Sequence, residues 1–521
     1  MNNQQLFDYL KSTTSYQINP TSVGLSEMEE SIIKDSINSV HQKYSTKTNN
    51  QLTSIIYVTN NKQYDKLKEL LDLTGDTDDF CQYNIENDYA RIALLFPNVN
   101  SILIPKKAKR SISRYVPKHL LREIDSDVNI AIEKCLVFLS YLSPTYYMEN
   151  KWKPLSSIRL HEQLKNGADN TYTYKAIIKA LKHGTKQTGP IIEVLQKENG
   201  TELYEIGKSS KQYRLTEAYL GAGLEEYLLQ DEAIIQQRNK TFYNALFEAQ
   251  NNIITSNLVS VYQQIDIPQL DEVVKYGKQL TRSNYRTKKG KILTMRNKHP
   301  NDYWRDANNR SFVEDNVELY KFLTGRGYMI PVIGKLSSGG RVVDSFNLMP
   351  SWIRSMVKIK GEPIVECDYK AMHPNLASKL YCGTGRHISH QIVADYLDVD
   401  ISVAKREHLS FFNKPYYPTK KLYEKGSMVQ SSVYEFYKEN EPEMLSQIEL
   451  HKRDSGYVAT AHRLFALEVE LMTEVIKQLN ELGIYVLYVY DALYCAESDS
   501  QTVKQIMNDV AEYYGVNTWV E

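Results

Sequence analysis

The sequence has few residues of the kinds that mark a secreted, zinc-binding or membrane protein. Its 521 residues include five cysteines, with no Cys-x-x-Cys pair and no His-Cys cluster at zinc spacing. They are Cys81, Cys135, Cys367, Cys382 and Cys495. No run reaches the roughly 18 apolar residues of a membrane span, and the first residues lack the pattern of a secretion signal. We therefore expect an intracellular, cytoplasmic protein with reduced cysteines and no membrane partner.

Three other absences narrow the function. The formal net charge is zero, so any affinity for nucleic acid would have to come from local clusters of Lys and Arg. The sequence has no Gly-rich phosphate loop of the Walker kind and no paired-carboxylate pattern typical of a proofreading exonuclease. It therefore predicts neither a helicase motor nor editing. The 42% hydrophobic and 24% charged residues are ordinary for a globular protein of three or four domains.

Two aspartates on apolar strand signals are the most informative residues present. Asp368 lies in the segment 364–369, and Asp491 ends the segment 485–491. Carboxylates on neighbouring strands could hold two Mg²⁺ ions roughly 3.5–4 Å apart, which stabilise the attacking and leaving oxygens of a phosphoryl transfer. A lone aspartate at a strand end is more commonly structural, so spacing alone leaves both interpretations open.

The segment from Gly339 to Glu521 resembles the polymerase core of family A DNA polymerases and the related phage single-subunit RNA polymerases. Four ordered blocks carry the resemblance. They are 340–350 with Arg354, Asp368-Tyr369 with Pro374, a fingers-like helix at 404–413, and a helix from 468 to 482 followed by Gly483 and the strand ending at Tyr490-Asp491. The resemblance implies a right-hand core of palm, fingers and thumb, and a template-directed nucleotidyltransferase.

The matching positions imply a role for each residue. Asp368 and Asp491 would bind two Mg²⁺ ions, for which Mn²⁺ could substitute, and the carbonyl of Tyr369 would add a ligand. Lys405, the third catalytic residue, would neutralise the triphosphate. The other implied contacts are Arg406 and Lys414 with the nucleotide, His373 and Phe412 with its sugar, and Arg341 and Arg354 with the primer strand.

The chain departs from the family pattern at several of these positions. Tyr490 replaces the usual histidine, and Ala492 stands where DNA polymerases of the family often have a third carboxylate. His373 replaces a glutamate that helps to exclude ribose, so the choice of sugar stays open. The fingers helix ends in Phe412-Asn413 instead of Tyr-Gly, and Ile401 occupies the place of an arginine. Arg406, His408 or Lys414 could share the phosphate-binding task.

Two upstream regions also point to nucleic acid. Between Lys278 and Lys298 the chain has eight basic residues and no acidic one, where the related enzymes build a thumb, and we expect Lys288, Lys289 and Lys291 to contact phosphates. A charge run of this kind is also common on a solvated surface.

Residues 152–215 read as a winged helix, with helices at 155–164 and 172–182 and a hairpin of strands 191–195 and 203–206 around Asn199-Gly200. Its candidate contacts are Lys175, Lys179, Lys182 and Lys208, although such domains also bind proteins.

We thus expect an α+β multidomain protein. Its parts are a small N-terminal α+β domain at 1–145, a winged-helix-like domain at 146–220, a helical thumb-like basic region at 221–330, and the palm and fingers at 331–521. Strand signals at 54–58, 92–95 and 102–104 and a helix signal at 62–71 belong to the first part. Its role is open, and it or the winged helix could bind replication proteins.

The favoured function is a DNA polymerase that extends a primer on a DNA template from nucleoside triphosphates, in the cytoplasm of a bacterial host if the chain belongs to a phage or plasmid. Two alternatives stay open. One is a single-subunit RNA polymerase or primase, which could use an RNA product or template. The other is a non-catalytic winged-helix replication or transcription factor with a polymerase-like scaffold.

Overall fold

The computed structural model describes residues 100–147, 151–164, 172–183, 189–204, 210–220, 223–262, 264–288, 290–296, 309–325, 330–417 and 426–521. The predicted elements at 54–58, 62–71 and 92–95, together with Cys81, Lys208 and Lys289, lie outside these residues. The described chain has a mixed α/β architecture that divides into two compact units. One holds the described residues within 97–247 and 274–326, and the other those within 248–273 and 327–521.

The first unit, called the upstream unit below, combines short helices with three small sheets. Its elements are β1 (Ser101–Pro105), α5 (Ala108–Tyr115), α6 (Lys118–Arg122), α7 (Val128–Ser140), η2 (Ser143–Tyr147), β2 (Lys153–Pro154), α8 (Ser157–Leu164), α9 (Thr173–His183), β3 (Ile192–Val194), β4 (Gln212–Leu215), α10 (Glu217–Leu220), β5 (Leu224–Leu228), most of α11 (Glu232–Ala249), most of α13 (Leu270–Arg282), β7 (Ile292–Thr294), β8 (Arg310–Phe312) and α14 (Val313–Gly325). Strands β1 and β5 pair antiparallel, as do the strands of the sheet β2-β4-β3, whereas β7 and β8 run parallel.

Helices α8 and α9 and the sheet β2-β4-β3 occupy the segment expected to be a winged helix. Tyr174, Ile177 and Leu181 are buried at the helical spacing that predicted α9. Strand β3 pairs with β4 and not with the segment 203–206 that the sequence led us to expect, whereas the turn at Asn199-Gly200 is present, with a φ of 80° at Gly200. The strand expected at 203–206 is not formed in its described part, where a single bridge joins Gln196 to Glu202.

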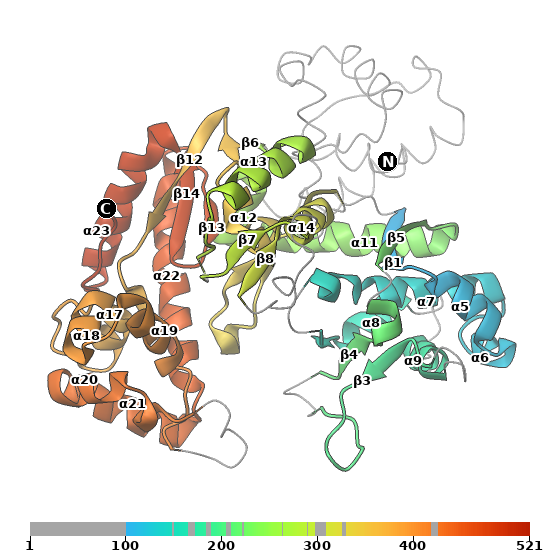
Figure 1. The fold of residues 1–521 in the computed structure, drawn as a ribbon, viewed down its shortest axis with the longest axis horizontal. Helices are drawn as coiled ribbons and strands as arrows, with labels where there is room; N and C mark the ends of the chain where they lie inside the picture. Colours follow the sequence, from blue (N-terminus) through green and yellow to red (C-terminus); the bar gives the residue numbers. More distant parts are fainter. Residues whose placement is uncertain are drawn as a thin grey trace, which may run out of the picture. The chain divides into compact units, whose positions relative to one another are not determined.

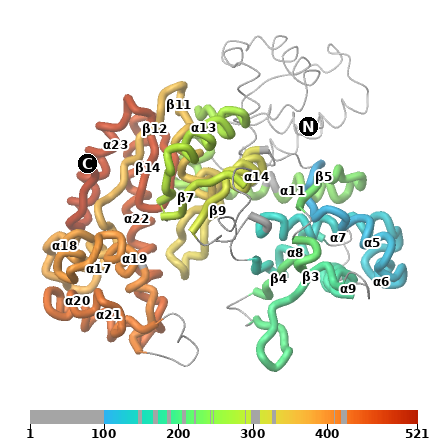
Figure 2. Tube along the Cα trace, viewed as in Figure 1, coloured from blue at the N-terminus to red at the C-terminus, as the bar shows by residue number. Residues whose placement is uncertain are grey.

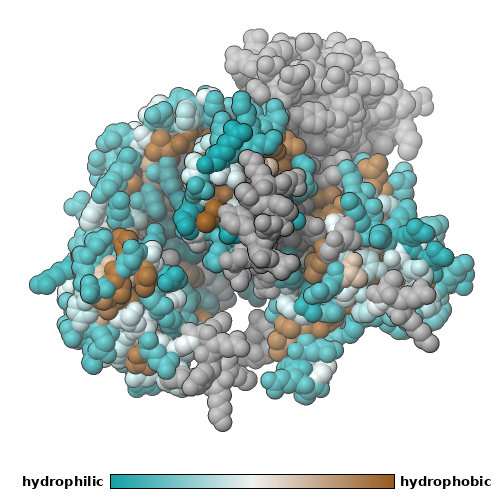
Figure 3. Space-filling view, in the orientation of Figure 1, coloured by the Kyte–Doolittle hydropathy of each residue, from teal (hydrophilic) through white to brown (hydrophobic). Residues whose placement is uncertain are grey.

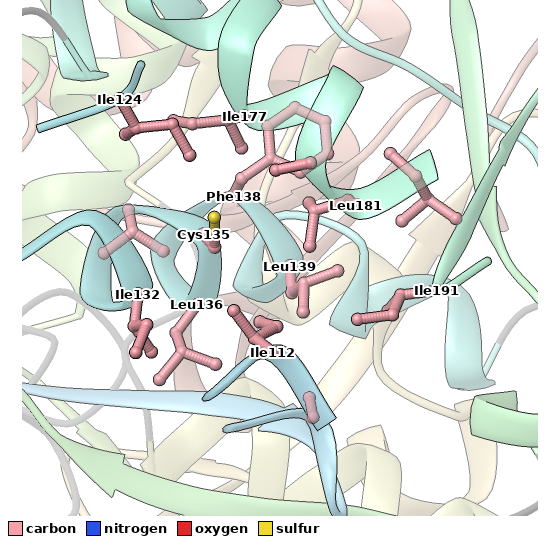
Figure 4. Close-up of a cluster of buried hydrophobic side chains, with 14 of the residues drawn as sticks. Ile112, Ile124, Ile132, Cys135, Leu136, Phe138, Leu139, Ile177, Leu181 and Ile191 are labelled. Atoms are coloured by element: carbon pink, nitrogen blue, oxygen red, sulfur yellow. The ribbon is translucent and has the colours of Figure 1, made fainter. Parts of the chain in front are cut away.

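The core of the upstream unit is apolar. Helix α7 begins where the Asp127 side chain accepts a hydrogen bond from the N–H of Asn129 at 2.7 Å, and it buries nearly all of its faces. Figure 4 shows Phe138, Leu136 and Leu139 of this helix surrounded by buried side chains from other elements. The ring of Phe138 also meets Tyr213 of β4 edge to face, with centroids 5.6 Å apart.

The second unit, called the C-terminal unit below, is built on one antiparallel sheet. Its elements are α12 (Ile253–Val261), β6 (Ile265–Asp266), β9 (Val332–Ile333), η5 (Leu336–Ser338), β10 (Val342–Val343), α15 (Ser345–Leu348), α16 (Ser351–Arg354), β11 (Lys358–Ile359), β12 (Glu362–Asp368), α17 (Met372–Leu380), α18 (His390–Leu397), α19 (Ile401–Phe411), η7 (Met428–Gln430), α20 (Val433–Asn440), α21 (Pro442–Ser455), α22 (Ala459–Glu481), β13 (Leu487–Val489), β14 (Ala492–Ala496), η8 (Glu497–Asp499) and α23 (Ser500–Tyr513). The sheet has the order β13-β14-β12-β11-β6.

Long helices cover this sheet, and shorter ones form a cluster beyond it. Strands β12 and β14 lie side by side next to α22 and α23 (Figure 1), and α12 and α15 pack on β13. Figure 2 traces the chain from β12 into the helical cluster α17–α21 and back through α22 to β14. Apolar side chains show on the surface of this cluster (Figure 3), where Ile392 and Tyr396 of α18 are 46% and 41% exposed.

Helix α22 is longer than the sequence predicts. It begins at Ala459, nine residues before the expected start at Glu468, because Ala461 and Leu464 continue the buried stripe toward the amino terminus. Within the described parts of the chain, no helix has both the length and the apolar character that a membrane crossing requires. Cys135, Cys367 and Cys495 are buried free thiols, and Cys382 is an exposed one.

Candidate active site

Two adjacent strands bring Asp368 and Asp491 together. Asp368 ends β12, and its register partner on β14 is Ala492, the residue after Asp491. The N–H of Tyr369 donates to the carbonyl oxygen of Asp491 at 3.4 Å and extends this ladder. Since paired strands lie roughly 4.7–4.9 Å apart, the two aspartates occupy neighbouring positions at one end of the sheet. The two aspartates meet as expected, but the strand predicted to carry Asp491 ends at Val489, and β14 lies between that strand and β12.

Asp491 stands in a tight turn. Val489 of β13 pairs directly with Ala492 of β14, so Tyr490 and Asp491 form a two-residue hairpin connection. Tyr490 has a φ of 60°, which a bulky residue rarely adopts. A turn of this kind favours Asn or Gly at the left-handed position, so tyrosine here indicates that its ring is needed.

The two carboxyl groups have different surroundings. Asp368 is exposed, whereas Asp491 is half-buried. Burial raises the pKa of Asp491 above its ordinary value, and the nearby carboxylate of Glu468 raises it further. The positive groups of His373 and Arg341 act in the opposite direction.

The donor chemistry at this end of the sheet suits Mg²⁺. Among the described residues, no three His, Cys, Asp or Glu side chains are grouped closely enough to hold a metal ion. Mg²⁺, however, is commonly held by one or two carboxylates, with substrate phosphates and waters as its other ligands. Asp368 and Asp491 supply two such hard oxygen groups, and the side chain of Tyr369 is turned away, donating its hydroxyl hydrogen to the carbonyl of Met507 at 2.5 Å.

A buried ionic network lies beside Asp491. Glu468 of α22 is fully buried and accepts a hydrogen bond on Oε1 from Nε of Arg341 at 2.7 Å. Its Oε2 accepts from Nη2 of Arg341 and lies 2.7 Å from Nε2 of His373. The guanidinium of Arg341 rests between the rings of Phe465 and Tyr490, 3.8 and 4.7 Å from their centroids. Arg341 and His373, both predicted site residues, thus meet at one carboxylate.

A close backbone contact fixes the start of this network. Gly339 has a φ of 94°, and a Cβ on it would lie 2.3 Å from Cβ of Phe465. Glycine is therefore required where the chain leading to Arg341 crosses α22.

His373, His390 and Lys405, from α17, α18 and α19, lie near one another. Lys405 and Arg406 are exposed on α19. Burial lowers the pKa of His390, at the start of α18, to about 4, and the charges of Lys405 and His373 contribute. His390 is therefore close to both, and the exposed positive charges of Lys405 and Arg406 suit an anionic ligand.

Phe412 is not placed as the sequence led us to expect. We expected it beside the sugar of a nucleotide, but it is only 3% exposed. Its ring packs against His408, Phe411 and Tyr437 in the core of the helical cluster. An aromatic side chain gains more from this burial than from an exposed position, and the sugar contact is not supported.

The segment after α19 is held by ionic and polar contacts. Lys414, a predicted nucleotide contact, pairs with Glu407 at 2.6 Å. The buried ammonium group of Lys452 donates to the carbonyls of Phe412 and Lys414 at 2.7 Å each and of Tyr457 at 3.1 Å. Lys414 is therefore engaged within the helical cluster, whereas Lys405 projects from it.

Arg354, predicted to position the primer, is 8% exposed. Its guanidinium lies 5.7 Å from the ring centroid of Phe346 and 5.5 Å from that of Tyr494. Its Nε and Nη1 have no hydrogen-bond partner among the described residues. It is a buried cation at the end of α16, packed against Tyr494 of β14.

The basic stretch of the upstream unit is only partly helical. Helix α13 ends at Arg282, and the chain then forms a hairpin in which the N–H of Leu293 donates to the carbonyl of Tyr285 at 2.9 Å. Lys288 is exposed near its tip, and Lys291 is half-buried. Arg296 is neutralised by Asp315 at 2.7 Å.

The candidate lysines of α9 are mostly paired. Lys179 binds Glu123 at 2.8 Å, and Lys182 binds Glu202 at 3.2 Å. Lys175 lies over the exposed ring of Tyr172, with its Nζ 4.3 Å from the centroid. This helix therefore offers less free positive charge than its sequence indicates.

Glu468 is the site residue that the sequence analysis missed. Its signal was present, because it occupies the apolar stripe of α22 between Leu464 and Leu471. A glutamate is almost never fully buried unless it is paired. Tyr488 was missed as well: it is buried on β13, and its hydroxyl has no hydrogen-bond partner within the described part of the chain.

Comparisons with known proteins do not identify a family for this chain. No family model matches the chain, and no curated protein matches it. Among solved structures, it is similar to the POL domain of Pol1 from M. smegmatis in complex with DNA primer-template and dNTP, with 9% sequence identity and a TM-score of 0.28. The match covers 100% of this chain and 80% of that chain. At this TM-score, function has to be argued from the site.

Proposed function

We propose that the chain is a template-directed nucleotidyltransferase that extends a nucleic-acid 3′ end, with DNA synthesis favoured. The observation that carries the proposal is the meeting of Asp368 and Asp491 at one end of a sheet, beside the buried network of Arg341, His373 and Glu468. These charged groups would not be expected at the end of the sheet for stability alone, because buried ion pairs usually add little to the stability of a fold.

The aspartates would bind the metal ions, and α19 would bind the triphosphate. Asp368 and Asp491 would hold two Mg²⁺ ions, which supply charge neutralisation for the attacking and leaving oxygens when bound. Lys405 and Arg406 would bind the triphosphate, and Lys405 would stabilise the charge that develops on the leaving pyrophosphate. His390 would stay neutral at physiological pH, since its pKa is about 4, and could accept or donate one hydrogen bond there.

The upstream unit would bind nucleic acid. The order of α8, α9 and the sheet β2-β4-β3 supports a winged helix. Lys175 and Tyr172 would contact the template there, while the pairing of Lys179 and Lys182 makes a protein partner the alternative. Arg282 and Lys288 would contact phosphates of the duplex.

Primer extension by the purified full chain tests the proposal. A labelled primer on a DNA template is incubated with Mg²⁺ and either dNTPs or rNTPs, using wild type, Asp368→Asn and the surface control Asp509→Asn. We expect template-directed extension by wild type and by Asp509→Asn, and loss of at least a hundredfold in Asp368→Asn. More than a tenth of the wild-type rate in Asp368→Asn, a loss below about 1.4 kcal/mol, would contradict the metal assignment. Preference for rNTPs would make the enzyme an RNA polymerase or primase.

A further inference from the structure

Glu468 is a buried carboxylate on which parts of the proposed site converge. Arg341 reaches it from the strand region after Gly340, and His373 reaches it from the first turn of α17. Both are partly exposed, at 22% and 18% of their side-chain surface, while the Glu468 side chain is 0% exposed. The two residues therefore face the site, and the group that holds them lies behind.

The hydrogen bonds into Glu468 determine which atoms face outward. Nε2 of His373 lies 2.7 Å from Oε2 of Glu468 and 3.0 Å from Nη2 of Arg341. The carboxylate has no hydrogen to donate and Nη2 is itself a donor, so in the contact with Glu468 the hydrogen is on Nε2 of His373 and is directed to the carboxylate. Nδ1 is the ring nitrogen left for other contacts. Glu468 thus orients the imidazole as well as the guanidinium.

The same carboxylate also acts on the hairpin that bears Asp491. Arg341 lies over the ring of Tyr490, the residue next to Asp491, with its Cζ 4.7 Å from the ring centroid. The same Cζ lies 3.8 Å from the ring centroid of Phe465, one turn before Glu468 on α22. Loss of the carboxylate would free Arg341 to rotate away from both rings.

The charge state of Glu468 fits this role. Burial alone would raise its pKa, but the hydrogen bond from His373 and the charge of Arg341 outweigh burial and leave the pKa below its ordinary value. Glu468 is therefore ionised. A buried ion pair usually adds little stability compared with apolar residues of similar volume, so stability alone does not account for it.

We propose that Glu468 is a positioning residue that couples Arg341 to His373, and so sets both the rate of nucleotide incorporation and the choice between ribose and deoxyribose. The proposal rests on the proposed nucleotidyltransferase function. It differs from a purely structural ion pair because it predicts that the effect of Glu468 on the rate passes through Arg341, and that its effect on the choice of sugar passes through His373.

The test uses single-turnover incorporation of one dNTP and the matching rNTP by the full chain. The variants are Glu468→Gln, Glu468→Asp, Arg341→Ala, the double variant Arg341→Ala with Glu468→Gln, and the control Glu470→Gln, which changes an exposed glutamate of the same helix. We expect Glu468→Gln to lower the incorporation rate ten- to a hundredfold and to change the rNTP to dNTP ratio at least threefold. Glu468→Asp should recover part of the rate, since it keeps the charge, and Glu470→Gln should behave as wild type.

The double variant separates positioning from stability. If Glu468 acts through Arg341, Glu468→Gln should cost less than about threefold in the Arg341→Ala background. Full additivity, or a Glu468→Gln variant with a lowered unfolding midpoint but an unchanged rate and sugar ratio, would overturn the proposal. Should Glu468→Gln fail to fold, an unchanged rate and ratio in Glu468→Asp would overturn it equally. Wild type that incorporates no nucleotide would instead refute the proposed function, and this inference with it.

Discussion

The upstream and C-terminal units bury charged side chains for different purposes. In the upstream unit, buried Glu133 accepts hydrogen bonds from the N–H groups of Gln230 and Asp231 at 2.8 and 2.7 Å, where α11 is about to begin. In the C-terminal unit, buried Glu468 binds side chains that remain partly exposed. The first arrangement satisfies backbone groups at a helix start, whereas the second holds functional groups at a surface.

Both units contain further charged side chains, some exposed and some buried. Lys179 and Glu123 of the upstream unit form an ion pair at 58% and 42% exposure, and such pairs contribute little. The upstream unit also buries Lys134, at 6% exposure, beside Asp125, and the C-terminal unit buries Asp344 and Arg354, at 0% and 8% exposure. Burying charge costs several kcal/mol per ion before compensation. We expect an active site to bear this free-energy cost, because its chemistry requires charged side chains near Asp368 and Asp491.

The largest effect should come from the apolar core. Phe138→Ala removes a fully buried ring that packs on Tyr213, and should cost about 3–5 kcal/mol of unfolding free energy. Urea unfolding followed by circular dichroism measures it. A loss below about 1 kcal/mol would show that this core is loosely packed and would weaken the contrast between the units.

The next effect depends on pH. Burial raises the pKa of Asp344 to about 6, above its unfolded value near 3.8. Between these pH values the folded state keeps a proton that the unfolded state has released, so this contribution to stability is full below pH 4 and lost as pH rises through 6. The span is about 3 kcal/mol.

Asp344→Asn should lack this loss. Its unfolding free energy relative to wild type should rise by about 3 kcal/mol between pH 4 and pH 7. The exposed Asp509→Asn variant is the control, with a difference that stays nearly constant. A pH-independent difference for Asp344→Asn would mean that Tyr262, which donates to this carboxylate, keeps the pKa of Asp344 near its usual value.

A smaller effect concerns the helical cluster. Lys405→Ala should lower kcat/KM for the nucleotide about a hundredfold, or about 2.7 kcal/mol, because Lys405 projects from α19. Lys414→Ala should change it less than about threefold, since Lys414 is occupied by Glu407. Steady-state kinetics on a saturating primer–template distinguish the two. The reverse order would place the triphosphate on Lys414 and shift our assignment of α19.

The smallest effect is expected at the surface of the upstream unit. Lys179→Met breaks the exposed pair with Glu123 and should change the unfolding free energy by less than about 1 kcal/mol. Differential scanning calorimetry of both variants, Lys179→Met and Lys175→Met, provides the comparison. A cost above about 2 kcal/mol for Lys179→Met alone would show that this pair is structurally important after all.

The sequence predicted elements well where a local pattern determines them. The apolar spacing of α9, the Asn199-Gly200 turn and the strands β12 and β13 depend on neighbouring residues. The turn after Val489 and the pairing of β14 with β12, which bring Asp491 next to Asp368, were not predicted. The roles of the individual site residues stay predictions.

Contacts between distant segments were not predictable in this way. Glu468 meets Arg341 across 127 positions of sequence, and no local pattern encodes that meeting. Phe412 is buried partly by packing against Tyr437 of another helix. The residues next to Phe412 in the sequence do not reveal this burial, so Phe412 was expected to contact a ligand. The pairing of Lys179 and Lys182 was likewise invisible, since their partners come from α6–α7 and from the β3–β4 hairpin.

The central claim is that the C-terminal unit gathers charge for chemistry and not for stability. Asp491→Asn tests it most directly, because the substitution keeps the shape of the side chain and removes the charge beside Glu468. Primer extension and urea unfolding are measured on the same preparation. We expect extension to fall at least a hundredfold while the unfolding free energy stays equal or rises. A variant that keeps more than a tenth of the extension rate, or loses several kcal/mol of stability, would contradict the account.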